Sequence, residues 1–264
     1  MGQHFLGNPA WQKRILDTLP RDPNDVWFEI GAGHGEMTHL LAGRGRRVVT
    51  IDTDARLAEN LRQRIQAQPD EWPSVEIVSG DVLQLDLGKL ADGGRFRVYG
   101  NLPYYITSPI LHHLFDYADQ IASIHVVIQF EVAARIAARP GRREYGYLSA
   151  ACQFYTRPEI VLRIPPGAFR PPPRVTSALV RMMLPGERAS LGGRDEAKFL
   201  EFVQMCFGQK RKTLRNNLRA VASDDRIHAA LGACGLRPDA RAEQLSLAQF
   251  SALFLEIFAE IGGK

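Results

Sequence analysis

The stretch Phe28–Thr38, FEIGAGHGEMT, decides the fold class. It joins a short apolar run to a segment with helical spacing, and the glycines Gly31, Gly33 and Gly35 stand at the junction. Glycines there let the backbone approach a ligand closely and leave N–H groups of the following helix free. The spacing GxGxG differs from the dinucleotide fingerprint GxGxxG, which would place a glycine at Glu36. Taken alone, the turn is also compatible with a purely structural role.

Short β-rich runs alternate with helical patterns on both sides of this turn. Strands are predicted at 26–30, 47–52, 75–78, 96–99 and 123–129, and helices at 36–42, 54–67 and 109–116. This alternation is typical of a parallel, doubly wound α/β sheet, in which ligands bind at the carboxyl ends of the strands. A helix at 147–155 follows. Two further runs, 159–164 and 178–184, have no long helix between them and are expected to form an antiparallel pair at the sheet edge.

The stretch 185–194, PGERASLGGR, is rich in glycine and charge and is typical of a linker. No strand pattern occurs from Asp195 onward. We therefore predict a domain boundary within 186–194, with a catalytic domain at 1–186 and a small, all-helical domain at 187–264.

Composition narrows the class of protein. The 264 residues are 45% hydrophobic and 23% charged, which allows one large core or a core domain with a small second one. Cys152, Cys206 and Cys234 are odd in number and follow no CxxC or Cys/His pattern, so neither disulfides nor a metal site is expected. No secretory leader or membrane-spanning run is visible. We expect a cytoplasmic monomer with no membrane partner; its net charge of +4 is compatible with a nucleic-acid partner.

Acidic residues end the next two predicted strands. Asp52 stands about twenty residues after the glycines, where a carboxylate can accept hydrogen bonds from ribose hydroxyls. Its alternative role is to cap the following helix, for which Asp54 is better placed. Asp81 can accept a proton from an adenine amino group, or it is only a turn residue. Without a phosphate-binding lysine in the turn, these acids favour S-adenosyl-L-methionine, and we expect Glu29 to face its charged end.

The fourth predicted strand runs into GNLPYYITSPI, residues 100–110. An adenine amino group is a feeble nucleophile, because its lone pair is delocalised into the ring. The Asn101 side-chain oxygen and the Leu102 carbonyl can accept its two hydrogens, while Pro103 stiffens the loop. Tyr104 offers a face on which the base can stack, worth roughly 1–3 kcal/mol. The alternative is a proline turn with core tyrosines, and Tyr105 is expected only to pack.

The chain resembles the bacterial 16S rRNA adenine N6,N6-dimethyltransferases (the KsgA family) over nearly its whole length. Besides the two stretches above, the segments that match are GQHFL, VVIQFEVAARI, YGYLSA, AFRPPPRVTSALVR and FGQKRKTLRNNL. The resemblance implies a Rossmann-like class I methyltransferase with a seven-stranded, mostly parallel sheet and a small C-terminal helical domain. It implies transfer of four methyl groups from S-adenosyl-L-methionine to two adjacent adenosines in a hairpin loop near the 3′ end of 16S rRNA. The implied substrate is an immature small (30S) ribosomal subunit, so the reaction belongs to rRNA processing and ribosome biogenesis.

The resemblance also implies residue roles. Gln3 and Phe5 would lie over the cofactor, Gly31 against its methionine part, Asp52 on its ribose and Asp81 on its adenine. Further implied cofactor contacts are His4, Leu6, Gly33, Thr53, Val82 and Asn101. Asn101, Leu102, Pro103 and Tyr104 would hold the target base, and Phe169 would stack on its other face.

The chain departs from the family pattern at several positions. The basic extension that usually precedes the GQ motif is absent from the sequence, which begins this motif at Gly2. Asp52 replaces the more usual glutamate, and its shorter reach puts contact with both ribose hydroxyls in doubt. His4 and Tyr105 both stand where asparagine is common.

Basic residues gather in two places. Arg142 and Arg143 precede Tyr145, and a second group begins after Phe207. In that group, apolar residues at 203, 207, 214, 218 and 221 suggest a helical stripe, and arginines recur every four residues on another face. Like charges at this spacing repel, so a uniform basic face favours an anionic partner, here rRNA. The alternative is a solvated face or salt bridges. The residues of this predicted second group are Lys210, Arg211, Lys212, Arg215 and Arg219.

Three rival functions are weaker. A 23S rRNA adenine N6-methyltransferase of the macrolide-resistance type shares the site, but FRPPPRV and YGYLSA favour the small-subunit enzyme. A non-catalytic RNA-binding assembly factor would have no need of intact Gly31, Asp52, Asp81 and Asn101. Methylation of a small molecule leaves the basic residues unexplained.

Overall fold

The computed structural model describes residues 4–191, 195–209 and 211–258. Gln3 and Lys210, both predicted to bind ligands, lie outside the described residues. The chain divides into two compact units, one formed by Met1–Ala133 and Arg157–Pro185 and the other by Ala134–Thr156 and Gly186–Lys264.

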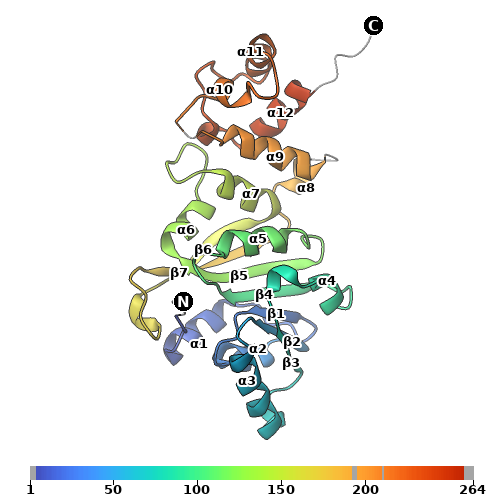
Figure 1. Cartoon of the computed structure of the whole chain (residues 1–264), viewed down its shortest axis with the longest axis vertical. Helices are drawn as coiled ribbons and strands as arrows, with labels where there is room; N and C mark the ends of the chain where they lie inside the picture. The colour runs from blue at the N-terminus through green and yellow to red at the C-terminus, as the bar shows by residue number, and fades with distance from the viewer. Residues whose placement is uncertain (1–3, 192–194, 210, 259–264) are drawn as a thin grey trace. The chain divides into compact units, whose positions relative to one another are not determined.

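The first unit contains a seven-stranded sheet in the order β3-β2-β1-β4-β5-β7-β6 (Figure 1). Strands β1 to β5 run parallel to one another, and β7 is antiparallel to both β5 and β6. The predicted antiparallel pair is confirmed, and β6 forms the edge. The strands are β1 (Val26–Ile30), β2 (Arg47–Asp52), β3 (Val75–Ser79), β4 (Phe96–Asn101), β5 (Ile121–Gln129), β6 (Arg157–Ile164) and β7 (Ser177–Met183).

Helices lie on both faces of the sheet, with α1, α2 and α3 on one side and α5 on the other (Figure 1). Asp54 caps α3 by accepting hydrogen bonds from the N–H groups of Arg56 and Leu57. Asp52 is therefore not needed as the cap. The helices of this part of the chain are α1 (Pro9–Thr18), α2 (Glu36–Ala42), α3 (Ala55–Ala67), α4 (Leu87–Leu90), α5 (Thr107–Phe115) and α6 (Phe130–Ile136), with short 3₁₀ turns at Pro69–Glu71, Val82–Gln84 and Pro166–Ala168.

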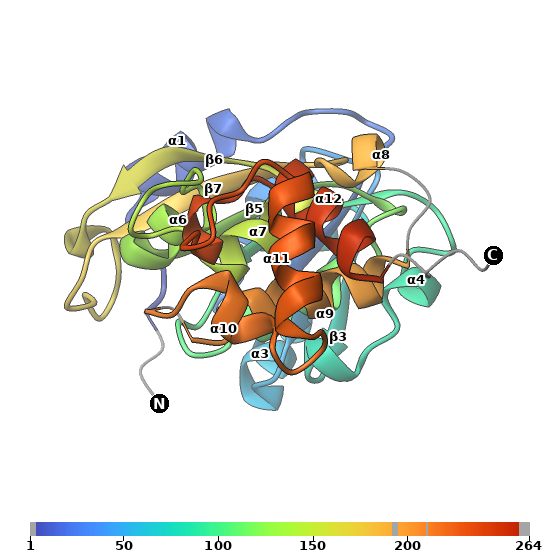
Figure 2. The same ribbon diagram turned by 90° about the horizontal axis from the view of Figure 1, so that it is seen from above.

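The second unit is helical around its own apolar core, seen from another side in Figure 2. The rings of Phe202 and Phe254 pack edge to face in this core, and α11 lies beside α12. Its helices are α7 (Tyr147–Tyr155), α8 (Arg188–Leu191), α9 (Glu196–Cys206), α10 (Leu214–Leu218), α11 (Asp224–Ala233) and α12 (Leu247–Phe258), with a 3₁₀ turn at Ala242–Gln244.

Residues 134–156 belong to this helical core, although the predicted boundary placed them in the first domain. Tyr145 is fully buried there and packs against Phe207, with ring centroids 5.9 Å apart. The N–H of Gly141 donates to the carbonyl of Glu243 over 2.7 Å. The linker at 186–194 is therefore one of three places where the chain passes between the units. The change in composition indicated this passage. The other two passages have no such signal, because one falls within α6 and the other lies between the end of α7 and the start of β6.

Candidate active site

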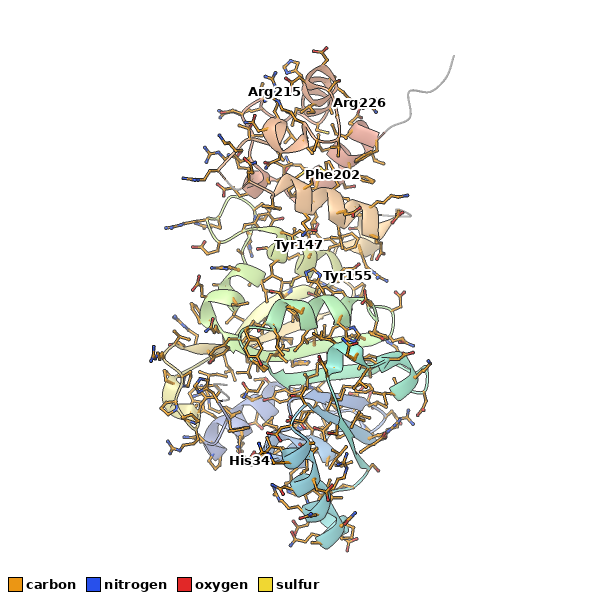
Figure 3. The ribbon with its side chains drawn as sticks, in the orientation of Figure 1. His34, Tyr147, Tyr155, Phe202, Arg215 and Arg226 are labelled. Atoms are coloured by element: carbon orange, nitrogen blue, oxygen red, sulfur yellow. The ribbon has the colours of Figure 1, made fainter. Side chains whose placement is uncertain are left out.

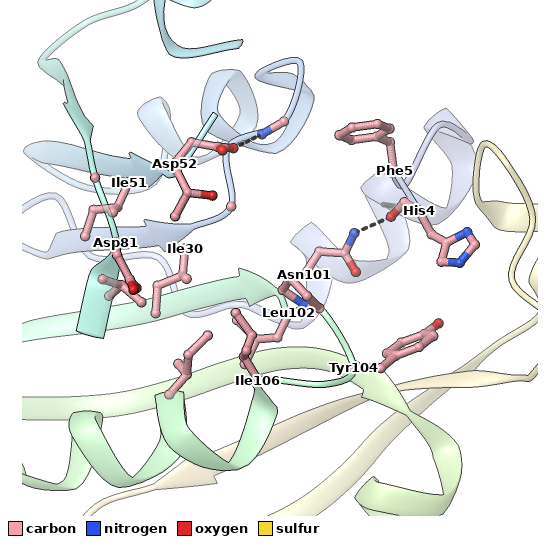
Figure 4. Close-up of a pocket in the computed structure, with 17 residues that line it drawn as sticks. His4, Phe5, Ile30, Ile51, Asp52, Asp81, Asn101, Leu102, Tyr104 and Ile106 are labelled. Atoms are coloured by element: carbon pink, nitrogen blue, oxygen red, sulfur yellow. Dashed lines mark hydrogen bonds between the residues drawn. The ribbon is translucent and has the colours of Figure 1, made fainter. Parts of the chain in front are cut away.

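A pocket lies at the carboxyl ends of the neighbouring strands β3, β2, β1 and β4 in the first unit (Figure 4). The N-terminal segment forms one of its walls through His4 and Phe5. The lining residues are His4, Phe5, Ile30, Gly31, Gly33, Ile51, Asp52, Thr53, Gly80, Asp81, Val82, Asn101, Leu102, Pro103, Tyr104, Ile106 and Ile110. The structure thus gathers most of the predicted cofactor and base contacts in one place.

The glycine turn is held open by backbone conformation and by Asp52. Gly31 and Gly33 have φ values of 82° and 56°, which disfavour any residue with a Cβ. A Cβ on Gly33 would also lie 2.8 Å from the Phe5 ring. Asp52, 6% exposed, accepts hydrogen bonds of 2.9 Å from the N–H groups of Gly33 and Asp54, one on each carboxylate oxygen. The turn and the end of β2 are thereby fixed to each other, and each oxygen keeps a lone pair for a ligand.

Asp81 is a turn residue and is also part of the pocket lining. One of its oxygens accepts a hydrogen bond of 3.0 Å from the N–H of Leu83 and caps the 3₁₀ turn Val82–Gln84. The side chain is exposed and also lines the pocket, at the same end as Asp52 (Figure 4). Thr53 and Val82, each next to one of these acids, line the pocket as well.

The Asn101 amide has one possible orientation. Its Nδ2 donates a hydrogen bond of 2.9 Å to the backbone carbonyl of His4. A carbonyl can only accept, so the NH₂ group must face His4 and the amide oxygen must point the other way. Next to it, the N–H of Leu102 donates to Val127 on β5, and the Leu102 carbonyl receives no hydrogen bond from any described residue. Two oxygens at the end of β4 are therefore available as acceptors.

Two rings stand beside these acceptors (Figure 4). The Tyr104 hydroxyl and Ser177 Oγ are 3.0 Å apart, within hydrogen-bonding distance. The Nδ1 of His4 lies 2.8 Å from the carbonyl of Pro171, to which it must donate. The planes of the His4 and Tyr104 rings differ by 28°, and their centroids are 6.1 Å apart.

A second, smaller cavity adjoins the first and shares Phe5, Gly31, Gly33 and Asn101 with it. Its other lining residues are Leu6, Glu29, Ala32, Glu36, Met37 and Tyr99. Glu29 is therefore not in the main pocket but directly next to it.

Glu29 is a buried acid with incomplete partners. One of its oxygens accepts hydrogen bonds from the hydroxyls of Thr38 and Thr50, at 2.5 Å and 2.9 Å. Burial raises the pKa of the Glu29 carboxyl to about 8, although both hydrogen bonds oppose the shift. The Tyr99 hydroxyl is buried and finds no partner among the described residues.

Two predictions about aromatic residues are wrong in this structure. Phe169 does not line the pocket: its side chain is 1% exposed and packs in the core with Leu6, Tyr99 and Leu179. A ring enclosed on all sides has no free face on which a base could stack. Tyr105, expected only to pack, is 74% exposed.

The predicted basic face of the second unit is interrupted by an acid. Arg215, labelled in Figure 3, donates two hydrogen bonds to Asp224 at the start of α11, and Arg219 donates two more. These contacts hold the pKa of the Asp224 carboxyl well below its usual range. The single predicted helix is also wrong, because α9 ends at Cys206 before Gly208 and α10 begins at Leu214. The face is therefore not uniform.

Other predicted RNA-binding residues are exposed on neighbouring loops of the same unit. Arg211 and Lys212 lie in the turn before α10, and the N–H of Leu214 donates to Ala240 over 2.8 Å. Arg142 and Arg143 lie in the loop that Gly141 joins to the carbonyl of Glu243. The first residue of α10 and the loop with Arg142 and Arg143 are thus both hydrogen-bonded to one short segment, 240–243.

The sequence interpretation missed the apolar part of the pocket. Ile30 and Ile51 are the last apolar residues of β1 and β2, and Ile106 and Ile110 lie at the start of α5. For Ile30 and Ile51, the position at a strand end next to the predicted contacts Gly31 and Asp52 is the signal that could have revealed them.

A sequence profile of the ribosomal RNA adenine dimethylases matches residues 1–259. The chain belongs to the ribosomal RNA adenine dimethylase family. Members of this family are S-adenosylmethionine-dependent methyltransferases, and the chain is such an enzyme.

Relatives of this dimethylase match it over nearly its full length. Ribosomal RNA small subunit methyltransferase A of Acidobacterium capsulatum is 42% identical over 96% of this chain and 89% of its own. The protein of the same name from Xanthomonas campestris is 42% identical over 96% of this chain and 93% of its own.

Two solved structures share the dimethylase fold across both units. A dimethyladenosine transferase from Plasmodium falciparum has a TM-score of 0.78 and 23% identity, covering 96% of this chain and 97% of its own. The 23S rRNA methyltransferase ErmE has a TM-score of 0.73 and 27% identity, and the match covers 96% of this chain and 99% of the ErmE chain. No helix in the described part of this dimethylase has the length and apolar character needed to cross a membrane.

The residues present fit S-adenosyl-L-methionine. Gly31 and Gly33 leave space for a ligand at the turn. A Cβ would be strained at either position, and at Gly33 it would also collide with Phe5. Asp52 and Asp81 offer acceptors at one end of the pocket, and the cavity below the turn contains the Glu29 carboxyl and the unpartnered Tyr99 hydroxyl. A ligand with ribose and adenine at one end and charged amino-acid groups at the other matches this distribution of polar atoms.

Proposed function

We propose that this dimethylase methylates N6 of two adjacent adenosines in a hairpin loop near the 3′ end of 16S rRNA, in the small ribosomal subunit, during ribosome biogenesis. The observation that carries this proposal is the 42% identity to small subunit methyltransferases A over 96% of the chain. Identity to the 23S rRNA methyltransferase ErmE is 27%. The enzyme would act as a monomer in the cytoplasm, where the small subunit is assembled.

The pocket supports a specific division of labour. S-adenosyl-L-methionine supplies an electrophilic methyl group when bound. Asp52 would accept hydrogen bonds from its ribose and Asp81 from its adenine, and the turn at Gly31 and Gly33 would adjoin its methionine part. Glu29 would face the charged end from the smaller cavity.

The end of β4 would hold the substrate. The Asn101 amide oxygen and the Leu102 carbonyl would accept the two N6 hydrogens, which directs the nitrogen lone pair out of conjugation with the ring and toward the methyl group. Pro103 would keep the two oxygens in place, and Tyr104 would support the base from one side. The N6 proton can leave to water after attack, so no further base is required.

Methyl incorporation tests the proposed function. Small subunits from cells that lack the endogenous activity are incubated with the enzyme and labelled S-adenosyl-L-methionine, and the modified bases are mapped by mass spectrometry. We expect dimethylation of two adjacent adenosines near the 3′ end of 16S rRNA. Incorporation into 23S rRNA instead, or into neither RNA, would contradict the proposal.

The second unit would supply contacts to rRNA phosphates. Arg142, Arg143, Arg211 and Lys212 are exposed around the segment 240–243 and form what we call the basic surface. Arg215 and Arg219 would contribute less than the sequence suggested, because Asp224 cancels one of their two charges.

The double substitution Arg211→Ala/Lys212→Ala is expected to weaken binding to small subunits and to flatten its dependence on salt. Removing one interaction with a phosphate should reduce the slope of log K against log salt concentration by about 0.7–0.9. The matched control is Arg56→Ala/Lys89→Ala, which removes two exposed charges from the first unit. Filter binding over a salt series measures both. Equal slopes for the two variants would argue against the basic surface.

A further inference from the structure

We propose that the imidazole of His4 forms one wall of the slot that holds the target adenine, with the Tyr104 ring as the opposite wall. This inference rests on the proposed function, since it concerns the base that would be methylated. It gives the His4 side chain a role in substrate binding, whereas the resemblance implied only a cofactor contact.

The spacing of the two rings suits an inserted base. Stacked aromatic carbons lie about 3.5–4.0 Å apart, so one base between two rings needs about 7 Å. The centroids of His4 and Tyr104 are 6.1 Å apart, and their planes differ by 28°. The two rings therefore form an offset, stacked pair toward the wide end of the usual range of about 4.5–7 Å. To admit a base, the rings must move apart by at least about one ångström and align their planes.

Both rings are held by their edges. The Nδ1 of His4 donates to the carbonyl of Pro171, and the Tyr104 hydroxyl pairs with Ser177. Hydrogen bonds in the plane of a ring fix its orientation and leave its faces accessible. Both side chains are only half-buried, and both line the pocket (Figure 4). The two walls are thus in place before any base enters, and they must move apart to receive it.

The slot is placed correctly for the proposed acceptors. The backbone carbonyl of His4 accepts the hydrogen bond that orients the Asn101 amide, so the wall and the acceptor are joined through one residue. A base between the two rings would present its edge to Asn101 and Leu102, which line the same pocket. His4 would then act twice, positioning Asn101 through its backbone and holding the base through its side chain.

The other candidate rings are engaged elsewhere. Phe169 is 1% exposed within the core. The Phe5 ring lies 4.6 Å from that of His34 and covers the Cα of Gly33, so it belongs to the cofactor end of the pocket. Among the rings that line the main pocket, His4 is therefore the partner for Tyr104.

Two substitutions separate stacking from anchoring. His4→Ala and His4→Phe both lose the hydrogen bond to Pro171, but only His4→Ala loses the aromatic ring. We expect His4→Ala to lower kcat/KM for small subunits by about 10- to 100-fold, the effect of removing one base–aromatic stack. His4→Phe should keep at least a third of the wild-type value. Both variants should bind S-adenosyl-L-methionine within twofold of wild type by calorimetry, because the backbone of His4 is unchanged.

Every other pattern overturns the inference. Equal falls in both variants would mean that His4 only anchors the N-terminal segment to Pro171. Wild-type kcat/KM in His4→Ala would mean that the ring is not used, and a loss of cofactor affinity would return His4 to the cofactor site. Failure of the proposed function is a different result, because the wild-type enzyme would then incorporate no methyl into small subunits.

Discussion

Asn101→Ala is expected to lower turnover by about 100- to 1,000-fold, the cost of removing one preorganised dipole from a reacting centre. The amide oxygen is fixed by the 2.9 Å hydrogen bond from Nδ2 to the His4 carbonyl, so it needs no reorganisation when the substrate binds. Without it, one N6 hydrogen has no acceptor and the nitrogen lone pair stays conjugated with the ring. Single-turnover methylation of small subunits measures this effect, and calorimetry should show that cofactor binding persists.

Asn101→Asp is the matched control for the orientation of the acceptor. It keeps an oxygen at the same distance from the backbone but loses the N–H donor, and a carboxylate oxygen would then face the His4 carbonyl. We expect this variant to be impaired as well, because repulsion moves the side chain away. Wild-type turnover in Asn101→Ala would refute the role of Asn101, and wild-type turnover in Asn101→Asp would show that orientation by His4 is unimportant.

Glu29→Gln is expected to stabilise the ligand-free protein increasingly as the pH rises. The pKa of the Glu29 carboxyl is about 8 in the folded state, because burial disfavours its charged form, against 4.5 as the reference for an unperturbed glutamate. Between these values the unfolded chain has released the proton and the folded chain has kept it, so the contribution of Glu29 to stability falls as the pH rises. From pH 5 to pH 7.5 this loss is about 3 kcal/mol. Glutamine carries no such proton and avoids the loss.

Denaturant unfolding of both proteins at several pH values measures the difference. The test uses only the change with pH of the difference in unfolding free energy, so a constant packing penalty of the substitution does not affect it. Glu36→Gln is the control, because Glu36 is exposed on the same turn and its substitution should change stability by less than about 0.5 kcal/mol at any pH. A gap between wild type and Glu29→Gln that stays constant with pH would mean that Glu29 is ionised in the fold.

The sheet and the pocket could be predicted because their signals are local. Short runs rich in apolar residues mark β1 and β2 with the correct bounds, and the glycine turn and the acids follow directly in the chain. Parallel strands bring their carboxyl ends to one edge, so residues that end neighbouring strands meet without further information. The Asn101 region was found in the same way.

The errors concern interactions between distant segments. Arg215 pairs with Asp224 across two helices, a relation that no periodicity of one helix reveals. The burial of Phe169 depends on a core cluster that includes Leu6 and Tyr99, which are far away in the sequence. The helix α7 was identified correctly, but its apolar face does not indicate which of the two cores it joins.

The place of α7 in the core of the second unit has a consequence for the order in which the chain can fold during synthesis. The partners of Ala150, Ala151 and Phe154 in the helical core come from residues 199–257, which leave the ribosome last. The residues of β6 and β7, which complete the sheet, emerge in between. The methyl-transfer unit can therefore finish its sheet while the apolar side of α7 still lacks its cover. While the ribosome synthesises the last helices of this protein, the nascent chain would therefore expose an apolar surface that is prone to aggregation.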